Sequence, residues 1–151
     1  MFVSEICRRK PVTIEAHEEL ERAAKLMRER HIGYLIVVEP YSPHGAPRPV
    51  GVLTDRDIVI GVLAKGADPR LVKVGDVMTR EPVVVSEDAS LNRALTEMRT
   101  IGVRRIPVVD AVGQLVGVLS LDDLLDALAA ELQNVAGSIR NEVRMEGTLR
   151  P

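Results

Sequence analysis

Apolar and polar positions follow two rhythms along the chain, one typical of helices and one typical of strands. Leu20, Ala23, Ala24 and Met27 recur at the spacing i, i+3, i+4, i+7, which places them on one face of an amphipathic helix. Short runs rich in β-branched residues surround this helix and predict strands over 11–14, 35–38 and 50–53. A further helix is predicted to follow the last of them. The pattern therefore predicts the order strand, helix, strand, strand, helix.

This order of elements occurs twice, because the sequence repeats itself. Residues 3–38 align with 74–109 without a gap, and VGVLT at 50–54 then aligns with VGVLS at 116–120. The second helix accordingly begins at Thr54 in the first copy and at Ser120 in the second. The first copy is longer because of a proline-rich stretch over 40–49, which predicts a surface loop.

Two repeats of this size are expected to share one core, since each alone buries too little apolar surface to be stable. The sequence predicts an α/β (α+β) fold of two βαββα repeats, packed through their sheets with pseudo-two-fold symmetry. The predicted boundaries are 1–66 for the first repeat and 67–130 for the second. Residues 131–151 are predicted to form a C-terminal helical extension and tail.

Composition removes several classes of protein. Hydrophobic residues make up 46% and charged residues 28%, which is ordinary for a globular chain and excludes disordered and fibrous classes. A net charge of −2 and 2% aromatic residues do not favour direct nucleic-acid binding. One Cys excludes an intramolecular disulfide, and three scattered His do not predict a metal site. No membrane span or signal segment is recognisable, so a cytoplasmic protein is expected.

The junction between the last strand and the last helix has the form Gly-h-h-[Thr/Ser]-x-x-Asp in both copies, at 51–57 and 117–123. A hydroxyl residue followed three positions later by an acid is a capping box, and such a cap stabilises a helix by about 1 kcal/mol. A helix N-terminus with a hydroxyl is also suited to phosphate, and a nearby carboxylate accepts ribose hydroxyls. Both interpretations remain open at this point.

With these junctions, the segments VGDVMTREPV at 74–83 and RRIPVVD at 104–110 make the chain resemble tandem CBS-domain proteins. This paired arrangement is called a Bateman module, and the resemblance is to its stand-alone bacterial type over about residues 3–128. It implies a regulatory module rather than an enzyme, without catalytic residues or a required cofactor. It implies an adenine nucleotide or S-adenosylmethionine as regulatory ligand in clefts between the repeats, a homodimer, and an unidentified regulated protein.

The resemblance also implies roles for particular residues. Asp57 and Asp123 are expected to bind ribose hydroxyls, and Thr54 and Ser120 to meet phosphate. The adenine is expected near the first strand of each repeat, opposite walls formed by 32–35 and 103–106. Tyr34 stacks on a base or fills the wall, and Arg104 is a phosphate contact or a solvated residue. The complete expected ligand-binding set is Thr13, Ile14, Tyr34, Thr54, Arg56, Asp57, Thr79, Val84, Val85, Arg104, Arg105, Ile106, Pro107, Ser120 and Asp123.

The two clefts are expected to differ. Cys7 and Arg8 stand in the first copy where the second has Met78 and Thr79 of the family pattern, which puts the first cleft in doubt or gives it a different preference. Each cleft is expected to keep one cation, Arg56 in the first and Arg105 in the second. Cys7 itself is expected to be a small buried residue.

The C-terminal helix leaves an alternative function open. Leu125, Leu128, Leu132, Val135 and Ile139 are spaced 3, 4, 3, 4, which is a heptad-like seam. This seam predicts either a helix packed across its own module or a contact for a dimer or partner. The alternative to ligand sensing is therefore a structural dimerisation module with vestigial clefts. An enzyme is disfavoured, because the sequence offers no nucleophile–base pair, glycine-rich phosphate loop or metal cluster.

Overall fold

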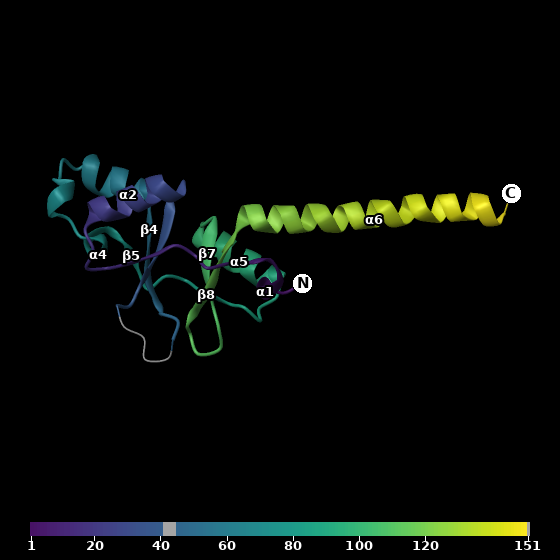
Figure 1. Ribbon diagram of the computed structural model, residues 1–151, viewed down its shortest axis with the longest axis horizontal. Helices are drawn as coiled ribbons and strands as arrows, with labels where there is room; N and C mark the ends of the chain where they lie inside the picture. The colour runs from purple at the N-terminus through teal and green to yellow at the C-terminus, as the bar shows by residue number, and fades with distance from the viewer. Residues whose placement is uncertain (41–44, 151) are drawn as a thin grey trace.

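Two four-stranded sheets form the body of the molecule, and one long helix projects from it (Figure 1). The computed structural model describes residues 1–40 and 45–150. The first sheet has the order β2 (Thr13–Glu15), β3 (Tyr34–Val38), β4 (Pro49–Thr54), β5 (Thr79–Arg80). The second has the order β1 (Arg8–Arg9), β8 (Leu115–Ser120), β7 (Arg105–Val109), β6 (Val85–Ser86). β2 pairs in parallel with β3 and β6 pairs in parallel with β7, whereas the hairpins β3–β4 and β7–β8 are antiparallel.

The helices of the described residues are α1 (Val3–Ile6), α2 (Leu20–Arg30), α3 (Asp55–Ile58), α4 (Val74–Val77), α5 (Leu91–Ile101) and α6 (Leu121–Leu149). The apolar spacing predicts α2 and α5, and α3 and α6 begin after the hairpins as predicted, whereas α1 and α4 are short helices that the pattern does not predict. A π-helical turn, η1 (Val59–Leu63), follows α3, and a short 3₁₀ turn, η2 (Pro69–Leu71), joins the repeats. The predicted α/β class and the order of elements are confirmed. The strands β2 and β6 are shorter than predicted, since Pro11 and Pro82 lack the N–H that a sheet ladder uses.

The two sheets exchange their edge strands. β1 comes from the first repeat but pairs with β8, and β5 opens the second repeat but pairs with β4. Val3 and Cys7 are consequently buried in the core of the second sheet, and Val74 and Met78 in the core of the first. Figure 1 shows the same exchange, with α1 beside α5 and β7, and α4 beside β5 and β4.

The glycine of each junction motif permits this exchange. A Cβ on Gly117 would lie 2.7 Å from the backbone oxygen of Arg8, closer than real Cβ atoms come to backbone. A Cβ on Gly51 would lie 2.6 Å from the sulfur of Met78 and 2.9 Å from the backbone oxygen of Thr79. The exchanged strand therefore packs directly on a position that has no side chain.

A third apolar cluster joins the two sheets. Ile36 and Val38 of β3 and Leu115 of β8 are buried together, with Tyr34 and Val118 packed against them. The predicted sheet-to-sheet packing is thus confirmed, and it rests on the aliphatic residues of one strand from each sheet.

Helix α6 leaves the body of the molecule almost as soon as it begins (Figure 1). Its buried residues are Asp123 and Leu124, both in the first turn. The interpretation of a helix packed across its own module is therefore wrong, and the helix continues to Leu149 where a tail was expected. Residues 41–44 of the predicted loop over 40–49, and the last residue of the tail, lie outside the described residues. In the described part of the chain, no helix is both long and apolar enough to cross a membrane.

Candidate functional site

A cleft of about 420 Å³ opens at the end of β8, between the two sheets. This volume falls in the range of small-molecule sites, which runs from roughly 300 to 1,000 Å³. Residues of both repeats form its walls, so the cleft exists only where the repeats meet. We call it the Asp123 cleft; its lining residues are Arg8, Arg9, Lys10, Pro11, Val12, His31, Ile32, Gly33, Tyr34, Ile36, Arg105, Val118, Ser120, Asp122 and Asp123.

Asp123 is the buried carboxylate of this cleft, with a side chain that is 8% exposed. Its Oδ2 accepts hydrogen bonds from the backbone N–H of Ser120 at 3.1 Å and from the Ser120 hydroxyl at 2.5 Å. The backbone N–H of Asp123 in turn donates to the Ser120 Oγ at 3.1 Å. The capping box that the motif predicted is therefore confirmed at the start of α6.

The second oxygen of Asp123 is held by a residue far away in the sequence. Nε of Arg8 donates to Oδ1 of Asp123 at 2.7 Å. Burial acts to raise the pKa of the Asp123 carboxyl, but the hydrogen bonds from Ser120 and Arg8 outweigh it and keep this pKa below its ordinary value. Asp123 is thus an ionised, hydrogen-bonded acceptor at neutral pH.

Tyr34 and Arg105 lie together in the Asp123 cleft, although they occupy matching positions of the two repeats. Cζ of Arg105 stands 6.0 Å from the centroid of the Tyr34 ring, within reach of a cation–π contact. The Tyr34 hydroxyl is buried, and it has no hydrogen-bond partner among the described residues. Burial raises the pKa of this hydroxyl against the opposing charge of Arg105, so Tyr34 stays neutral and forms part of the wall.

The backbone at the edge of the cleft adopts a conformation that non-glycine residues rarely take. Lys10 has φ 58° and His31 has φ 54°, both in the left-handed region. The matching positions of the other repeat, Glu81 and Gly102, have φ 49° and 69°. Each repeat therefore carries the same turn before its first strand and the same left-handed residue at the end of its first long helix. Such conformations in residues with side chains concentrate at functional sites.

The junction motif of the first repeat, at 51–57, has the same local geometry. The backbone N–H of Thr54 donates to Oδ2 of Asp57 at 2.9 Å, and the N–H of Asp57 donates to the Thr54 Oγ1 at 3.1 Å. Asp57 makes no ion pair within residues 1–40 and 45–150. Arg56 beside it is exposed. The second repeat therefore supplies a carboxylate tied to a cation, and the first supplies one that lacks this partner.

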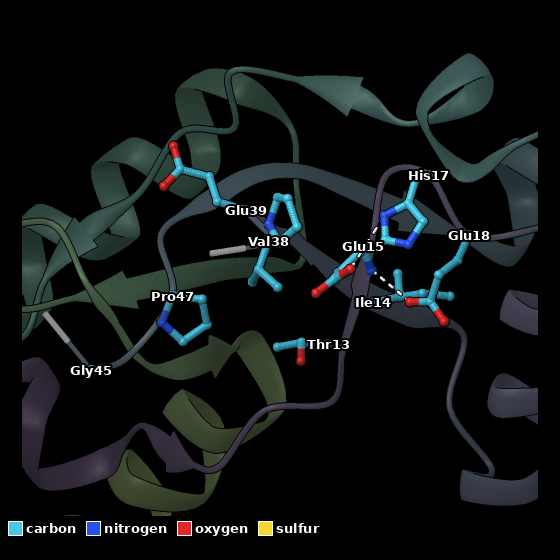
Figure 2. A pocket seen from close by; sticks show the side chains of 10 residues that line it. Thr13, Ile14, Glu15, His17, Glu18, Val38, Glu39, Gly45 and Pro47 are labelled. Atoms are coloured by element: carbon cyan, nitrogen blue, oxygen red, sulfur yellow. Dashed lines mark hydrogen bonds and ion pairs between the residues drawn. The ribbon is translucent and has the colours of Figure 1, made fainter. Parts of the chain in front are cut away.

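Four residues expected to contact the adenine lie away from the Asp123 cleft. Ile14 and Val85 are each 3% exposed and belong to the cores of the two sheets. Thr13 lines a separate hollow with Glu15, His17 and Glu18 (Figure 2). There the carboxylate of Glu15 contacts Nδ1 of His17, and the backbone N–H of Glu15 donates to the carboxylate of Glu18. Val84 lies beside α5, in a hollow shared with Ser86 and Arg93. Pro11 and Val12 line the cleft instead, because the chain enters the sheet later than predicted.

The other expected residues take varied positions. Ile106 and Pro107 are buried in β7, and Thr79 is exposed on β5. Arg104 forms an exposed ion pair with Asp122, its Nη2 lying 3.6 Å from Oδ1, which favours a solvated residue. Cys7 is buried as expected, and burial raises the pKa of its thiol. No group of three or more metal-ligating side chains occurs in the described part of the chain.

The strand exchange also changes which cleft differs from the family pattern. Cys7 and Arg8 were expected to alter the cleft of the first repeat, but Arg8 lines the cleft of Asp123 in the second. Arg8, Arg9, Lys10 and His31 are lining residues that the sequence reasoning missed. The repeat alignment places Arg8 on Thr79, an expected site position, so the signal was present but was assigned to the wrong repeat.

Known proteins resemble this chain over most of its length. The model of the CBS domain matches residues 3–63 and 74–130. An uncharacterised protein of Methanopyrus kandleri is 35% identical over 123 residues, which cover 82% of this chain and 60% of that protein. The chain thus spans less than two thirds of the length of this relative.

Two solved structures share the fold at TM-scores above 0.7. The CBS domain pair of protein MJ0100, in complex with 5′-methylthioadenosine and S-adenosyl-L-methionine, is 26% identical with a TM-score of 0.71, covering 85% of this chain and 99% of that one. A hexameric CBS-CP12 protein from bloom-forming cyanobacteria is 26% identical with a TM-score of 0.72, covering 99% and 88%. With two tandem matches that span most of its residues, the chain belongs to the CBS-domain family.

Proposed function

We propose that this protein is a regulatory module that binds an adenosyl ligand in the Asp123 cleft and signals its presence to a partner protein. The observation that carries the proposal is the Asp123 carboxylate, which is buried, ionised and fixed at a helix N-terminus inside a cleft of nucleoside size. CBS-domain pairs are in general regulatory rather than catalytic modules. The complex of the related domain pair with 5′-methylthioadenosine and S-adenosyl-L-methionine supports the ligand class.

The lining residues suit the parts of such a ligand. The carboxylate of Asp123 lines the cleft and can accept ribose hydroxyls. The partly apolar wall of Ile32 and Tyr34, with Pro11 and Val12, suits the adenine ring. Arg105 and the N-terminus of α6 suit phosphate. We assign the Thr54 and Asp57 motif, with Arg56 and Thr79, to a second site by the symmetry of the repeats.

A signal requires that the ligand bind one arrangement of the repeats better than another. The Asp123 cleft meets this condition, because its walls come from both sheets: Tyr34 belongs to the first, and Arg105 and Ser120 belong to the second. A ligand in the cleft therefore fixes the position of one sheet relative to the other. The regulated partner would respond to that change in relative position.

We further propose that the chain forms a homodimer through α6. Most of this helix is in contact with solvent, and the exposed Val143 follows Ile139 of the seam after four residues, one helical turn further along. The same observation favours the second candidate function, a dimerisation scaffold whose clefts bind nothing. The hexameric CBS-CP12 protein shows that related chains assemble. Ligand binding distinguishes the two candidates.

Thermal unfolding in the presence of single compounds tests the sensing function. AMP, ADP, ATP, S-adenosylmethionine and cyclic di-AMP form the panel, with GTP and NAD for comparison. A bound ligand at a hundred times its Kd stabilises the fold by about 2.7 kcal/mol, which raises Tm by about 5–10 °C. Adenosyl compounds are expected to raise Tm and GTP is not. No rise with any adenosyl compound would favour the scaffold.

The variant Asp123→Ala tests the site itself. We expect it to abolish the Tm rise from the Asp123 cleft while the chain still folds, because the lost cap costs about 1 kcal/mol. Asp126→Ala is the matched control, since Asp126 lies on the exposed face of the same helix one turn later. Isothermal titration of both variants provides the measurement. Unchanged affinity in Asp123→Ala would remove this carboxylate from the site.

A further inference from the structure

Arg8 occupies the oxygen that a ribose would need. Oδ2 of Asp123 already accepts two hydrogen bonds from Ser120, and Oδ1 accepts one from Nε of Arg8 at 2.7 Å. These three hydrogen bonds leave the carboxylate one free acceptor site, on Oδ1, whereas two neighbouring ribose hydroxyls need two. A ribose that binds Asp123 through both hydroxyls must therefore displace Arg8. Displacing Arg8 breaks a charge-assisted hydrogen bond within the protein. The ligand therefore has to offer Arg8 another interaction in its place.

The displaced guanidinium would remain in the cleft, next to other cations. The Arg8 side chain is 68% exposed, so it can leave Asp123 without breaking a packed core. Lys10 and Arg105 line the same cleft, and Arg9 is tied to Glu87 at its edge by an ion pair of 3.0 Å. A phosphate chain offers these groups anionic oxygens, and a guanidinium binds phosphate with two parallel hydrogen bonds. A neutral thioether or a positively charged sulfonium offers Arg8 no such partner.

The other repeat provides an internal comparison. Thr79 stands at the position of Arg8, and Glu81 stands at that of Lys10 with the same left-handed backbone. The sequence thus replaces two cations with a hydroxyl and a carboxylate at matching places. The Asp57 carboxylate correspondingly lacks the ion pair that Asp123 makes, within the residues that the structure describes.

We propose that the Asp123 cleft selects adenosine ligands that carry a phosphate chain, and that Arg8 is the residue that determines this selectivity. When the ribose binds Asp123, Arg8 moves from the carboxylate to the phosphates. A ligand without phosphate breaks the ion pair and gains nothing in return, so it binds more weakly. This inference rests on the proposed function, since it concerns the choice of ligand at the same site.

Isothermal titration of the full chain with ATP and with 5′-methylthioadenosine tests the selectivity. The protein with Arg8 and its Arg8→Thr variant both carry Asp57→Ala, so that binding to the Asp123 cleft alone is measured. We expect ATP to bind at least about tenfold more tightly than 5′-methylthioadenosine when Arg8 is present. In Arg8→Thr we expect ATP to bind more weakly and 5′-methylthioadenosine more tightly, so that the ratio falls toward one. Arg70→Thr is the control, because Arg70 is an exposed, ion-paired arginine outside the cleft.

Salt provides a readout without the Arg8 substitution. Raising NaCl from about 50 mM to about 500 mM screens exposed charges, so it should weaken ATP binding severalfold and leave 5′-methylthioadenosine nearly unchanged. Arg8→Gln serves as the second variant if Arg8→Thr does not fold. A ratio that Arg8→Thr leaves unchanged, or tighter binding of 5′-methylthioadenosine to the parent protein, would overturn the selectivity while adenosyl binding stands. Failure of both compounds to bind the parent protein would overturn the proposed function as well.

Discussion

At the scale of single residues, the junction motif combines two roles in one side chain. Asp123 caps α6 through Oδ2 and holds Arg8 through Oδ1, so the same carboxylate stabilises the helix and joins β1 to the start of α6. The two interpretations of the motif, cap and ligand contact, are therefore compatible. The cap is present in both repeats, whereas the ion pair distinguishes the second.

The pH dependence of stability follows from this carboxylate. The pKa of Asp123 in the folded state lies below its ordinary value of 3.8, because Ser120 and Arg8 favour the charged form against burial. Its contribution to stability is thus complete above pH 3.8 and is lost as the pH falls through the lowered pKa. We expect the advantage of the parent protein over Asp123→Asn to shrink as the pH falls below 3.8.

Urea unfolding at a series of pH values measures this effect. Asp126→Asn is the control, since Asp126 is exposed on the same helix and is expected to show no comparable loss. An advantage over Asp123→Asn that stays constant across the acidic range would contradict an ionised, hydrogen-bonded Asp123.

At the scale of elements, α6 is unusual because most of its large apolar side chains beyond Leu124 are exposed. Leu132 is 70% exposed, and the other seam residues are more than 40% exposed. Helices in proteins owe most of their stability to packing of an apolar face, so this seam predicts a partner. The first half of α6 carries Asp122, Asp123, Asp126 and Glu131 and no cation, whereas the second half carries Arg140 and Arg144 with Glu142 and Glu146. This difference in charge favours antiparallel pairing of two copies of α6.

Leu132→Asp is expected to separate the proposed homodimer into monomers. A charge in the middle of the seam would have to be buried without a partner, which is strongly unfavourable. Light scattering after size-exclusion chromatography measures the mass, and circular dichroism reports any loss of helix. Gln133→Asp introduces the same charge beside the seam and should leave the mass unchanged. Equal masses of the parent protein and Leu132→Asp would rule out this seam as the dimer contact.

At the scale of the whole molecule, the strand exchange makes each repeat depend on the other. Val3 is fully buried in the core of the second sheet, and Val74 is fully buried in the core of the first. Neither sheet is complete without a segment from the other repeat. The two repeats are thus expected to unfold together.

Val3→Ala should destabilise the protein by about 2 kcal/mol, from lost apolar burial and the cavity that remains. Its main effect should fall on the second sheet, although Val3 lies in the first repeat. Hydrogen exchange is expected to speed up most in β7 and β8 for Val3→Ala, and in β3 and β4 for Val74→Ala. Faster exchange confined to the sheet of the mutated repeat would contradict the exchange of strands.

The sequence by itself determined the repeated local structure. The apolar spacing located α2 and α5, the β-branched runs located the hairpins, and the motif located the caps at Thr54 and Ser120. These features depend on neighbours a few residues apart, so periodicity and capping patterns are sufficient to reveal them. The junction motifs, with the segments at 74–83 and 104–110, also indicated the family.

Tertiary structure alone decided which residues share a cleft. Arg8 and Asp123 are 115 positions apart, and no local pattern shows that β1 crosses to the second sheet rather than joining the first. Either edge offers the same backbone hydrogen bonds, and the choice depends on where Val3 and Cys7 find an apolar core. The path of the chain between β1 and β2 likewise brings Lys10, Pro11 and Val12 into the Asp123 cleft, which Thr13 and Ile14 do not line. The course of α6 away from the body likewise shows only in the tertiary structure, where the helix is buried no further than Leu124.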